Sequence, residues 1–441
     1  MEANNSIKDY SKFYGSYAKL RKPSPIRELF KYTVDPSIIS LGGGLPNPNA
    51  FPFKKITVEL KDGEPLEIQG DDLSNALQYT QTYGLPKFTA WLKNLQIRNH
   101  KLPAADNKER PWNVGVTSGS QEGLALVFSS LLDQGDSIII ESPTYSGTLS
   151  ILGPMGLNMA GIQVDKNGMI PSLLENVLEN WDTLYPGKRF PKLIYTIPTG
   201  QNPSGCSMTV ERKRTIYKLC SKYDLLILED DPYFYLQFEM SEEDKAEGLV
   251  VEPGQPILGV SFLSMDTDQR VIRFDSLSKI LSSGLRIGFV TGPFKLLEVM
   301  QNAQQASTLH ASGVSQTIAL SLLQKWGIDG FHQHIVKVQA FYRERRAVFL
   351  GHVETHLKGL VEYVSPSAGM FVWFRVLNTD DTYQMITSKA IEKKVVLVPG
   401  IAFDPNPEVN LVSPYVRASF SIATDEQMEE ACKRFASLLQ N

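Results

Sequence analysis

The sequence predicts an α/β protein with a mostly parallel central sheet flanked by helices, together with a smaller α+β domain. Between Trp112 and Gly292, short β-branched runs alternate with longer runs whose apolar residues recur every three or four positions, which is typical of a parallel sheet covered by helices. After about Lys337 the pattern changes to one long charged helix, several strands and a final helix. A chain of 441 residues is long enough for both domains.

Each element is predicted from its own pattern. The strands of the large domain are NVGVTS, SIIIES, KLIYTIP, LLILED, VIRFDS and GFVTG, and its clearest helices are QEGLALVFSSLLDQ, PSLLENVLENW and ERKRTIYKLCSKYD. In the small domain we expect the helix FYRERRAVFLGHVETHL, the strands GMFVWFRV, KVVLVPG and YVRASFS, and the helix DEQMEEACKRFASLLQ. We expect three parts: an N-terminal segment over 1–55 that joins the small domain, a large domain over 56–335 and a small C-terminal domain over 336–441.

The acidic segment Glu239–Pro256 interrupts this order between two strands, and we expect it to be a solvent-exposed loop.

The charge balance points to a small-molecule partner. The chain has 44 Lys and Arg against 48 Asp and Glu, a net charge of -4, so no overall field attracts nucleic acid or an anionic membrane. The three cysteines are sparse, odd in number and lack C-x-x-C spacing, which argues against a disulfide framework and a structural zinc site. These features favour a reducing compartment and no metal.

The N-terminal region indicates the compartment. No run approaches the ~20 apolar residues of a membrane span, and the first residues lack a secretory signal. Glu2 and Asp9 argue against a mitochondrial transit peptide, so we expect a cytoplasmic location. The basic residues Lys19, Arg21 and Lys22 keep a mitochondrial location open.

Polar residues follow several of the predicted strands. Ligands of parallel sheets bind beyond the carboxyl ends of the strands, so we expect these residues to converge on one crevice. They are Gly119, Ser120, Gln121, Tyr145, Asn202, Asp230, Tyr233, Ser278 and Lys279.

These residue types meet the demands of pyridoxal phosphate. Gly119, Ser120 and Gln121 open a helix whose N-terminus favours an anion, while Ser276, Ser278 and Arg286 add phosphate donors. Lys279 would hold the cofactor covalently and, once freed by the substrate amine, carry a proton between the substrate Cα and C4′ of the cofactor.

The ring of the cofactor needs further partners. A buried carboxylate keeps its nitrogen protonated, and Asp230 at a strand end suits that role. Tyr233 and Asn202 can donate to the ring oxygen, and Tyr145 can stack on the ring face.

The motifs SGSQEG, ESPTYSG, IPTGQNPSG, LEDDPYF, DSLSK followed by GLRIGF, and YVRASF resemble those of the fold-type I aminotransferases. RKPSPIR, SLGGGLPNPNAFPF, ALQYTQTYG and SPSAGMFVW are similar to kynurenine/2-aminoadipate and fungal aromatic amino-acid aminotransferases. The resemblance implies the cofactor roles given above for Lys279, Asp230, Asn202, Tyr233 and Tyr145. It implies phosphate contacts from Ser120, Gln121, Ser276, Ser278 and Arg286, with Tyr79 reaching across from the other subunit of a homodimer.

The resemblance also implies a substrate site. Arg417 would bind the α-carboxylate, while Asn202, Arg27, Gly44, Leu45, Tyr79 and Phe371 would line the pocket, and residues 1–55 would cover it. The implied reaction moves the α-amino group of an aromatic amino acid, kynurenine or 2-aminoadipate to 2-oxoglutarate. The longer segment Glu239–Pro256 and the sequence QTYG depart from the relatives, so small or branched aliphatic donors remain an alternative.

Two other functions compete with this interpretation. The turn from Gly115 to Gly119 imitates the G-x-S-x-G motif of hydrolases with threonine at its centre, but no histidine follows a strand end as a catalytic partner. A DNA-binding regulator with an aminotransferase-like domain would need a basic domain ahead of RKPSPIR, which begins at Arg21.

The histidines offer a metal alternative. His332 and His334 point to different faces of a helix, whereas His352 and His356 share a face but lack an evident third ligand in the sequence. Solvated helix residues are therefore the preferred interpretation.

Overall fold

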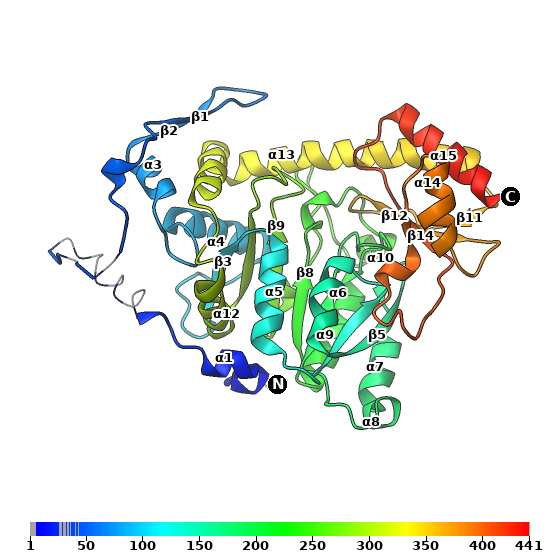
Figure 1. Ribbon diagram of the computed structural model, residues 1–441, viewed down its shortest axis with the longest axis horizontal. Coiled ribbons are helices and arrows are strands. Elements are labelled where there is room, and N and C mark those ends of the chain that lie inside the picture. The colour runs from blue at the N-terminus through cyan, green and yellow to red at the C-terminus, as the bar shows by residue number, and fades with distance from the viewer. Residues whose placement is uncertain are drawn as a thin grey trace. The chain divides into compact units, whose positions relative to one another are not determined.

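The computed structural model describes residues 6–25, 29, 32, 35, 37–39, 41–42 and 44–440, and its ribbon is shown in Figure 1. Two compact units divide the chain: residues 1–133 with 266–331, and residues 134–265 with 332–441. The predicted domain boundaries remain a prediction. No helix in the described part of the chain combines the length and apolar character of a membrane-spanning segment.

The first unit contains an antiparallel set of three strands, β3, β10 and β9, with β10 paired to both neighbours. All six residues of each strand are buried. Helices α5 and α12 pack on these strands, and α4 packs on β3. The elements of this unit are η1 (Ser11–Phe13), α1 (Ser16–Leu20), η3 (Pro48–Ala50), β1 (Ile56–Val58), β2 (Leu66–Ile68), α3 (Gly70–Leu77), α4 (Pro86–His100), β3 (Trp112–Thr117), α5 (Ser120–Leu131), β9 (Val271–Ser276), β10 (Gly288–Pro293), α12 (Phe294–Ser307) and the first part of α13 (Gly313–His356).

The second unit contains four parallel strands, of which three were predicted from the sequence and β5 was not. β5, β4, β7 and β8 pair in that order and all run parallel. The apolar runs of β4, β7 and β8 are buried on both faces, as expected for parallel strands covered by helices. The elements up to residue 265 are β4 (Ser137–Ser142), α6 (Ser146–Leu152), η4 (Gly153–Met155), β5 (Asn158–Asp165), β6 (Gly168–Met169), α7 (Pro171–Glu179), α8 (Trp181–Leu184), β7 (Leu193–Thr196), α9 (Val210–Lys222), β8 (Leu226–Asp230), η5 (Phe234–Leu236), α10 (Glu242–Ala246) and α11 (Phe262–Met265).

The second unit also holds a smaller antiparallel sheet in the order β11-β12-β14-β13. Figure 1 shows β12 and β14 beside α14 and α15 near the C-terminus. Helix α15 begins with a capping box formed by Thr424 and Gln427, which stabilises a helix start. The remaining elements are β11 (Val361–Glu362), β12 (Phe371–Val376), η6 (Met385–Lys389), α14 (Ala390–Glu392), β13 (Val398–Pro399), η7 (Gly400–Phe403), β14 (Tyr415–Ser419) and α15 (Asp425–Leu439).

Two expectations need correction. The predicted loop Glu239–Pro256 contains helix α10, which Ser241 caps by accepting a hydrogen bond from the Asp244 amide. Acidic residues in its first turn and Lys245 at its end suit the helix dipole. The predicted helix over 341–357 is part of the much longer α13, whose backbone is non-helical at Gly327. The fold class itself is as predicted.

Candidate active site

Lys279 lies in a turn that follows strand β9. Its side chain is largely enclosed, and burial together with the positive charge of Arg286 lowers the pKa of the amine. A lowered pKa increases the neutral fraction at neutral pH, and a neutral amine can act as a nucleophile or accept a proton. The environment of Lys279 therefore suits a reactive lysine.

Donors for an anion gather around the start of helix α5. The helix begins at Ser120, and its N-cap residue Gly119 offers no side-chain cap; the N-terminus of a helix favours an anion. Arg286 lies against this end, with Nη1 at 3.4 Å from Ser278 Oγ and Nη2 at 3.4 Å from Ser118 O. Ser276 Oγ accepts a hydrogen bond from the amide of Ser278 at 3.2 Å.

Two glycines keep this anion site open. A Cβ on Gly119 would come within 2.2 Å of Arg286 Nη2, and Gly119 also has a φ of +82°. A Cβ on Gly288 would come within 2.5 Å of the amide nitrogen of Ser120. The cradle thus accepts only glycine at these positions, and its amides, hydroxyls and guanidinium match a phosphate group. These residues fit the phosphate of pyridoxal phosphate.

In the second unit, Asp230 ends strand β8 and is buried. Its Oδ2 accepts a 2.7 Å hydrogen bond from the hydroxyl of Tyr195, which in turn accepts one at 2.9 Å from Thr148. Burial and the charge of Asp230 raise the pKa of Tyr195 well above its usual value, so the phenol stays protonated. The sequence analysis missed Tyr195 and Thr148, because Tyr195 lies inside an apolar strand.

Tyr233 and Asn202 lie near this carboxylate. Burial, with smaller contributions from Asp230 and Tyr145, raises the pKa of Tyr233, and the side chain of Asn202 acts on it in the opposite direction. The phenol therefore remains a donor at neutral pH. Tyr145 is the N-cap residue of α6, and a Cβ on Gly147 would lie 2.3 Å from its ring. A carboxylate, a phenol, an amide and an aromatic ring are the groups that a pyridinium ring requires.

Arg417 lies on strand β14, with its guanidinium 4.4 Å from the centroid of the Phe371 ring and 4.9 Å from that of Phe403. Its Nη1 donates a 2.8 Å hydrogen bond to Asn202 Oδ1. Burial lowers the pKa of this guanidinium. A half-buried arginine held between two rings presents a planar fork for a carboxylate.

Glu141 is a buried acid that the sequence analysis also missed. It lies within β4 and accepts hydrogen bonds from the Thr196 hydroxyl, the Ile197 amide at 3.2 Å and Gln201 Nε2 at 3.1 Å. These bonds fasten the segment that leads to Asn202. Burial raises the pKa of Glu141 to about 7. A charged residue inside the apolar run SIIIES was the available signal, because buried charges need partners.

Three other predicted site residues that the structure describes are exposed. Tyr79 is half exposed and contacts His310 edge-on at 6.2 Å between ring centroids. Gly44 and Leu45 are exposed, and nothing lies within 4 Å of a Cβ on Gly44. Arg27 lies outside the described residues. The first unit thus brings together Lys279, Ser276, Ser278, Arg286, Ser120 and Gln121 at the end of α5 and β9, and the second unit brings together Tyr145, Asn202, Asp230, Tyr233, Phe371 and Arg417.

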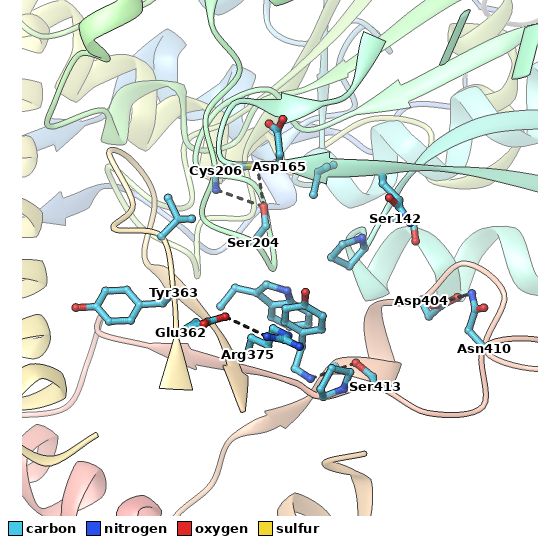
Figure 2. A pocket seen from close by; sticks show the side chains of 18 of the residues that line it. Ser142, Asp165, Ser204, Cys206, Glu362, Tyr363, Arg375, Asp404, Asn410 and Ser413 are labelled. Carbon is cyan, nitrogen blue, oxygen red and sulfur yellow. Dashed lines mark hydrogen bonds and ion pairs between the residues drawn. The ribbon is translucent and has the colours of Figure 1, made fainter. Parts of the chain in front are cut away.

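A cavity of about 1090 Å³ lies elsewhere in the second unit. Figure 2 shows Arg375 and Glu362 hydrogen-bonded in it, with Ser204 and Cys206 on the opposite wall. None of the predicted site residues lines this cavity. Its walls therefore play no part in the assignment of the cofactor site.

The fold and these side chains define an enzyme that binds a phosphorylated ring cofactor and a carboxylate substrate. The chain belongs to the class I and II aminotransferase family, whose model matches residues 43–435. This family uses pyridoxal 5′-phosphate. The hydrolase alternative is therefore wrong.

Named relatives span nearly the whole chain. The mitochondrial kynurenine/alpha-aminoadipate aminotransferase of Bos taurus is 42% identical over 439 residues, covering 98% of this chain and 99% of the relative. An aromatic amino acid aminotransferase of Dictyostelium discoideum is 38% identical, covering 99% of this chain and 89% of the relative. The crystal structure of aminotransferase Aro8 from Candida albicans superposes with a TM-score of 0.86 at 30% identity, covering 99% of this chain and 98% of that chain.

Proposed function

We propose that this aminotransferase moves the α-amino group of an aromatic amino acid, kynurenine or 2-aminoadipate to 2-oxoglutarate, giving a 2-oxo acid and glutamate. The names of the bovine and Dictyostelium relatives support this substrate range. The observation that carries the proposal is the position of Arg417, whose guanidinium is packed against Phe371 and bonded to Asn202. It offers both a carboxylate partner and an apolar surface at one place.

Lys279 is the proposed catalytic residue. Bound pyridoxal phosphate supplies an electron-withdrawing ring that stabilises negative charge on the substrate Cα. The low pKa of Lys279 suits an amine that holds the cofactor and then takes up and returns the Cα proton. Its position directly after Ser278 brings it to the anion cradle of Arg286.

The remaining roles follow from the two sets of residues. We assign the phosphate to Ser120, Gln121, Ser276, Ser278 and Arg286, and the ring to Asp230, Tyr233, Asn202 and Tyr145. Asp230, oriented by Tyr195, would hold the ring nitrogen protonated.

The side chain of the substrate meets other residues. Phe371, Leu45 and Tyr79 are proposed to line its pocket, and aromatic or long aliphatic donors suit these apolar side chains. Arg27 is proposed to bind the distal carboxylate of 2-aminoadipate or 2-oxoglutarate. The N-terminal segment over 1–55 is proposed to cover the pocket.

A panel of amino donors with 2-oxoglutarate or pyruvate tests the substrate range, with Arg27→Ala assayed beside the wild type. Loss of a charged hydrogen bond costs roughly 1.5 to 3 kcal/mol, so kcat/KM for 2-aminoadipate should fall by about 10- to 150-fold while that for phenylalanine changes little. Equal losses for both donors would refute the role of Arg27. Activity with small aliphatic donors alone would refute the aromatic range and leave the cofactor chemistry standing.

We also propose an obligate homodimer in which Tyr79 of one subunit reaches the phosphate of the other. Its support is apolar surface on the N-terminal side of the chain: Tyr17 is 71% exposed, Leu20 79% and Leu41 98%. Large apolar side chains left exposed on one chain are available to be buried by another. Mixing inactive Lys279→Ala and Tyr79→Ala subunits should restore activity, because a mixed dimer regains one complete site. No recovery, in mixtures shown to exchange subunits, would contradict sharing of the site.

We propose a cytoplasmic compartment, supported by the three cysteines, which are all free and fit a reducing environment. Fluorescence of a C-terminal fusion in living cells tests it, and import into mitochondria would overturn it.

A further inference from the structure

Two histidines of α13 face two carboxylates of α15. His352 and His356 lie one helical turn apart, as do Asp425 and Glu429, so each pair occupies one face of its helix. His352 Nε2 lies 2.6 Å from Asp425 Oδ1, and His356 Nε2 lies 3.4 Å from Glu429 Oε1. The two imidazole rings are nearly parallel, with an interplanar angle of 18°.

The ligand atoms of His352, His356 and Glu429 all lie within 4.8 Å of one another. Bonds of 2.0–2.1 Å to a tetrahedral Zn²⁺ place ligand atoms about 3.3 Å apart, so small rotamer changes would bring the three into range. We propose that these three residues form a surface site for a divalent transition-metal ion of the Zn²⁺ class, with the fourth position open to water. Glu429 supplies the third ligand that the sequence alone did not reveal.

The backbone that carries the carboxylates is held in place before any ion arrives. Arg345 of α13 donates from Nε to Phe420 O at 2.8 Å and from Nη2 to Ala423 O, which fastens the segment leading into α15. The capping box of Thr424 then fixes the first turn, where Asp425 lies. Two prepositioned pairs reduce the ordering cost of binding an ion.

Charges around the cluster also bear on the proposal. Two neutral imidazoles and one carboxylate leave a bound divalent ion with a single net positive charge, and His356 ends α13, where the carbonyl end of a helix favours a cation. Lys433 opposes binding, because its Nζ lies 2.8 Å from Glu429 Oε1. The histidine side chains are 22% and 21% exposed, so an ion can enter from solvent.

The donor set selects the class of ion. Imidazole favours Zn²⁺, Co²⁺, Ni²⁺ and Cu²⁺, whereas Mg²⁺ and Ca²⁺ favour sites made of oxygen atoms alone. Because the ligands come from both α13 and α15, a bound ion would cross-link these two helices. The proposal does not depend on the substrate of the enzyme.

The test is titration of Zn²⁺ into the chelator-treated holoenzyme by calorimetry. We expect one high-affinity ion per chain, and visible absorption bands of a Co²⁺ derivative that show coordination by histidine nitrogen. Loss of an outer-sphere partner alone weakens metal sites by about 10- to 100-fold, so His352→Gln, His356→Gln and Glu429→Gln should each weaken binding by at least about tenfold. His334→Gln, on the same helix but outside the cluster, should leave the affinity unchanged.

Lys433→Met separates metal binding from simple packing of the two helices. It removes the competing ammonium and should leave Zn²⁺ affinity equal or higher. Circular dichroism of each variant verifies that the fold is retained. Absence of Zn²⁺ binding in the wild type would overturn the proposal, as would affinity that survives both histidine substitutions or falls in Lys433→Met as it does in His352→Gln.

Discussion

The hydroxyl of Tyr195 donates a 2.7 Å hydrogen bond to Oδ2 of Asp230, and both side chains are buried. β7 and β8 are neighbouring parallel strands, so the sheet itself holds the phenol beside the carboxylate. A carboxylate that accepts such a bond is stabilised in its ionised form. This relationship makes the proposed partner of the ring nitrogen both charged and oriented.

Asp230→Asn should retain the fold and lose most activity. A neutral amide cannot hold the ring nitrogen protonated, so single-turnover proton abstraction from the amino donor should slow by about a hundredfold or more. Asp231→Asn is the matched control, because Asp231 is also buried but lies just beyond the end of β8. Full activity in Asp230→Asn with an inactive Asp231→Asn would identify the other carboxylate as the ring partner.

Tyr195→Phe should have a smaller effect than Asp230→Asn. The carboxylate keeps its charge but loses one donor, and a hydrogen bond to a charged group contributes about 1.5 to 3 kcal/mol. We expect kcat/KM to fall about tenfold, with a change in the visible absorption of the bound cofactor as pH is varied. A variant with wild-type kinetics and spectrum would show that Tyr195 serves packing alone.

Lys279→Ala should abolish turnover. Loss of general acid-base catalysis alone costs ~10²- to 10⁴-fold, and the covalent link to the cofactor is lost as well. Borohydride reduction followed by peptide mapping should label Lys279 in the wild type. Lys295→Ala, at an exposed lysine of α12, is the control and should be fully active. Activity of Lys279→Ala within about tenfold of the wild type would overturn the assignment.

Gly119→Ala should weaken binding of the cofactor. The added methyl group would come within 2.2 Å of Arg286, whereas at Gly135, with a similar φ of +80°, it would meet nothing within 4 Å. Both variants place a side chain at a positive φ, which strains the backbone in either case, but only the first also disturbs the phosphate donors. Equilibrium dialysis should show that Gly119→Ala binds pyridoxal phosphate at least tenfold more weakly than Gly135→Ala. A tenfold difference corresponds to roughly 1.4 kcal/mol of binding free energy. Equal retention would place the phosphate elsewhere.

Glu141 should make stability depend on pH. Its pKa is raised from 4.5 to about 7 in the fold, so the folded state binds more protons than the unfolded state between these values. The contribution of Glu141 to the free energy of unfolding is fully present below about pH 4.5. It is lost as the pH rises through 7, and the total loss is roughly 3 kcal/mol. Urea unfolding should therefore show the wild type losing stability relative to Glu141→Gln between pH 5 and pH 8. A constant difference between the two would show that Glu141 is already ionised at pH 5.

Much of the fold follows from local patterns in the chain. The apolar runs that predict strands correspond to β3, β4, β7, β8, β9 and β10 within one or two residues, because runs buried on both faces are distinctive. Helix α10 was missed because its charged residues resemble a loop. The predicted helix over 341–357 was too short at its start, because the helical backbone that ends at His356 begins after the non-helical Gly327.

Residues of the site were predictable where they belong to a local motif and not where they depend on neighbouring strands. Asp230 and Lys279 lie in recognisable motifs. Tyr195 acquires its contact with Asp230 only because β7 pairs with β8, and no local pattern specifies which strands become neighbours. Glu429 was hidden for the same reason, since only the packing of α15 brings it to the histidines of α13.

Arg417 determines which molecules the enzyme rejects. Its guanidinium is hydrogen-bonded to Asn202 and lies against the rings of Phe371 and Phe403. An amine with the same aromatic group but no carboxylate, such as the decarboxylated form of an amino acid, would cover this arginine without offering it an acceptor. Leaving a buried charge uncompensated is costly, and sites built around such a group discriminate strongly against ligands that lack the matching one. Biogenic amines should therefore be neither substrates nor effective competitors, even where their side chains suit the pocket.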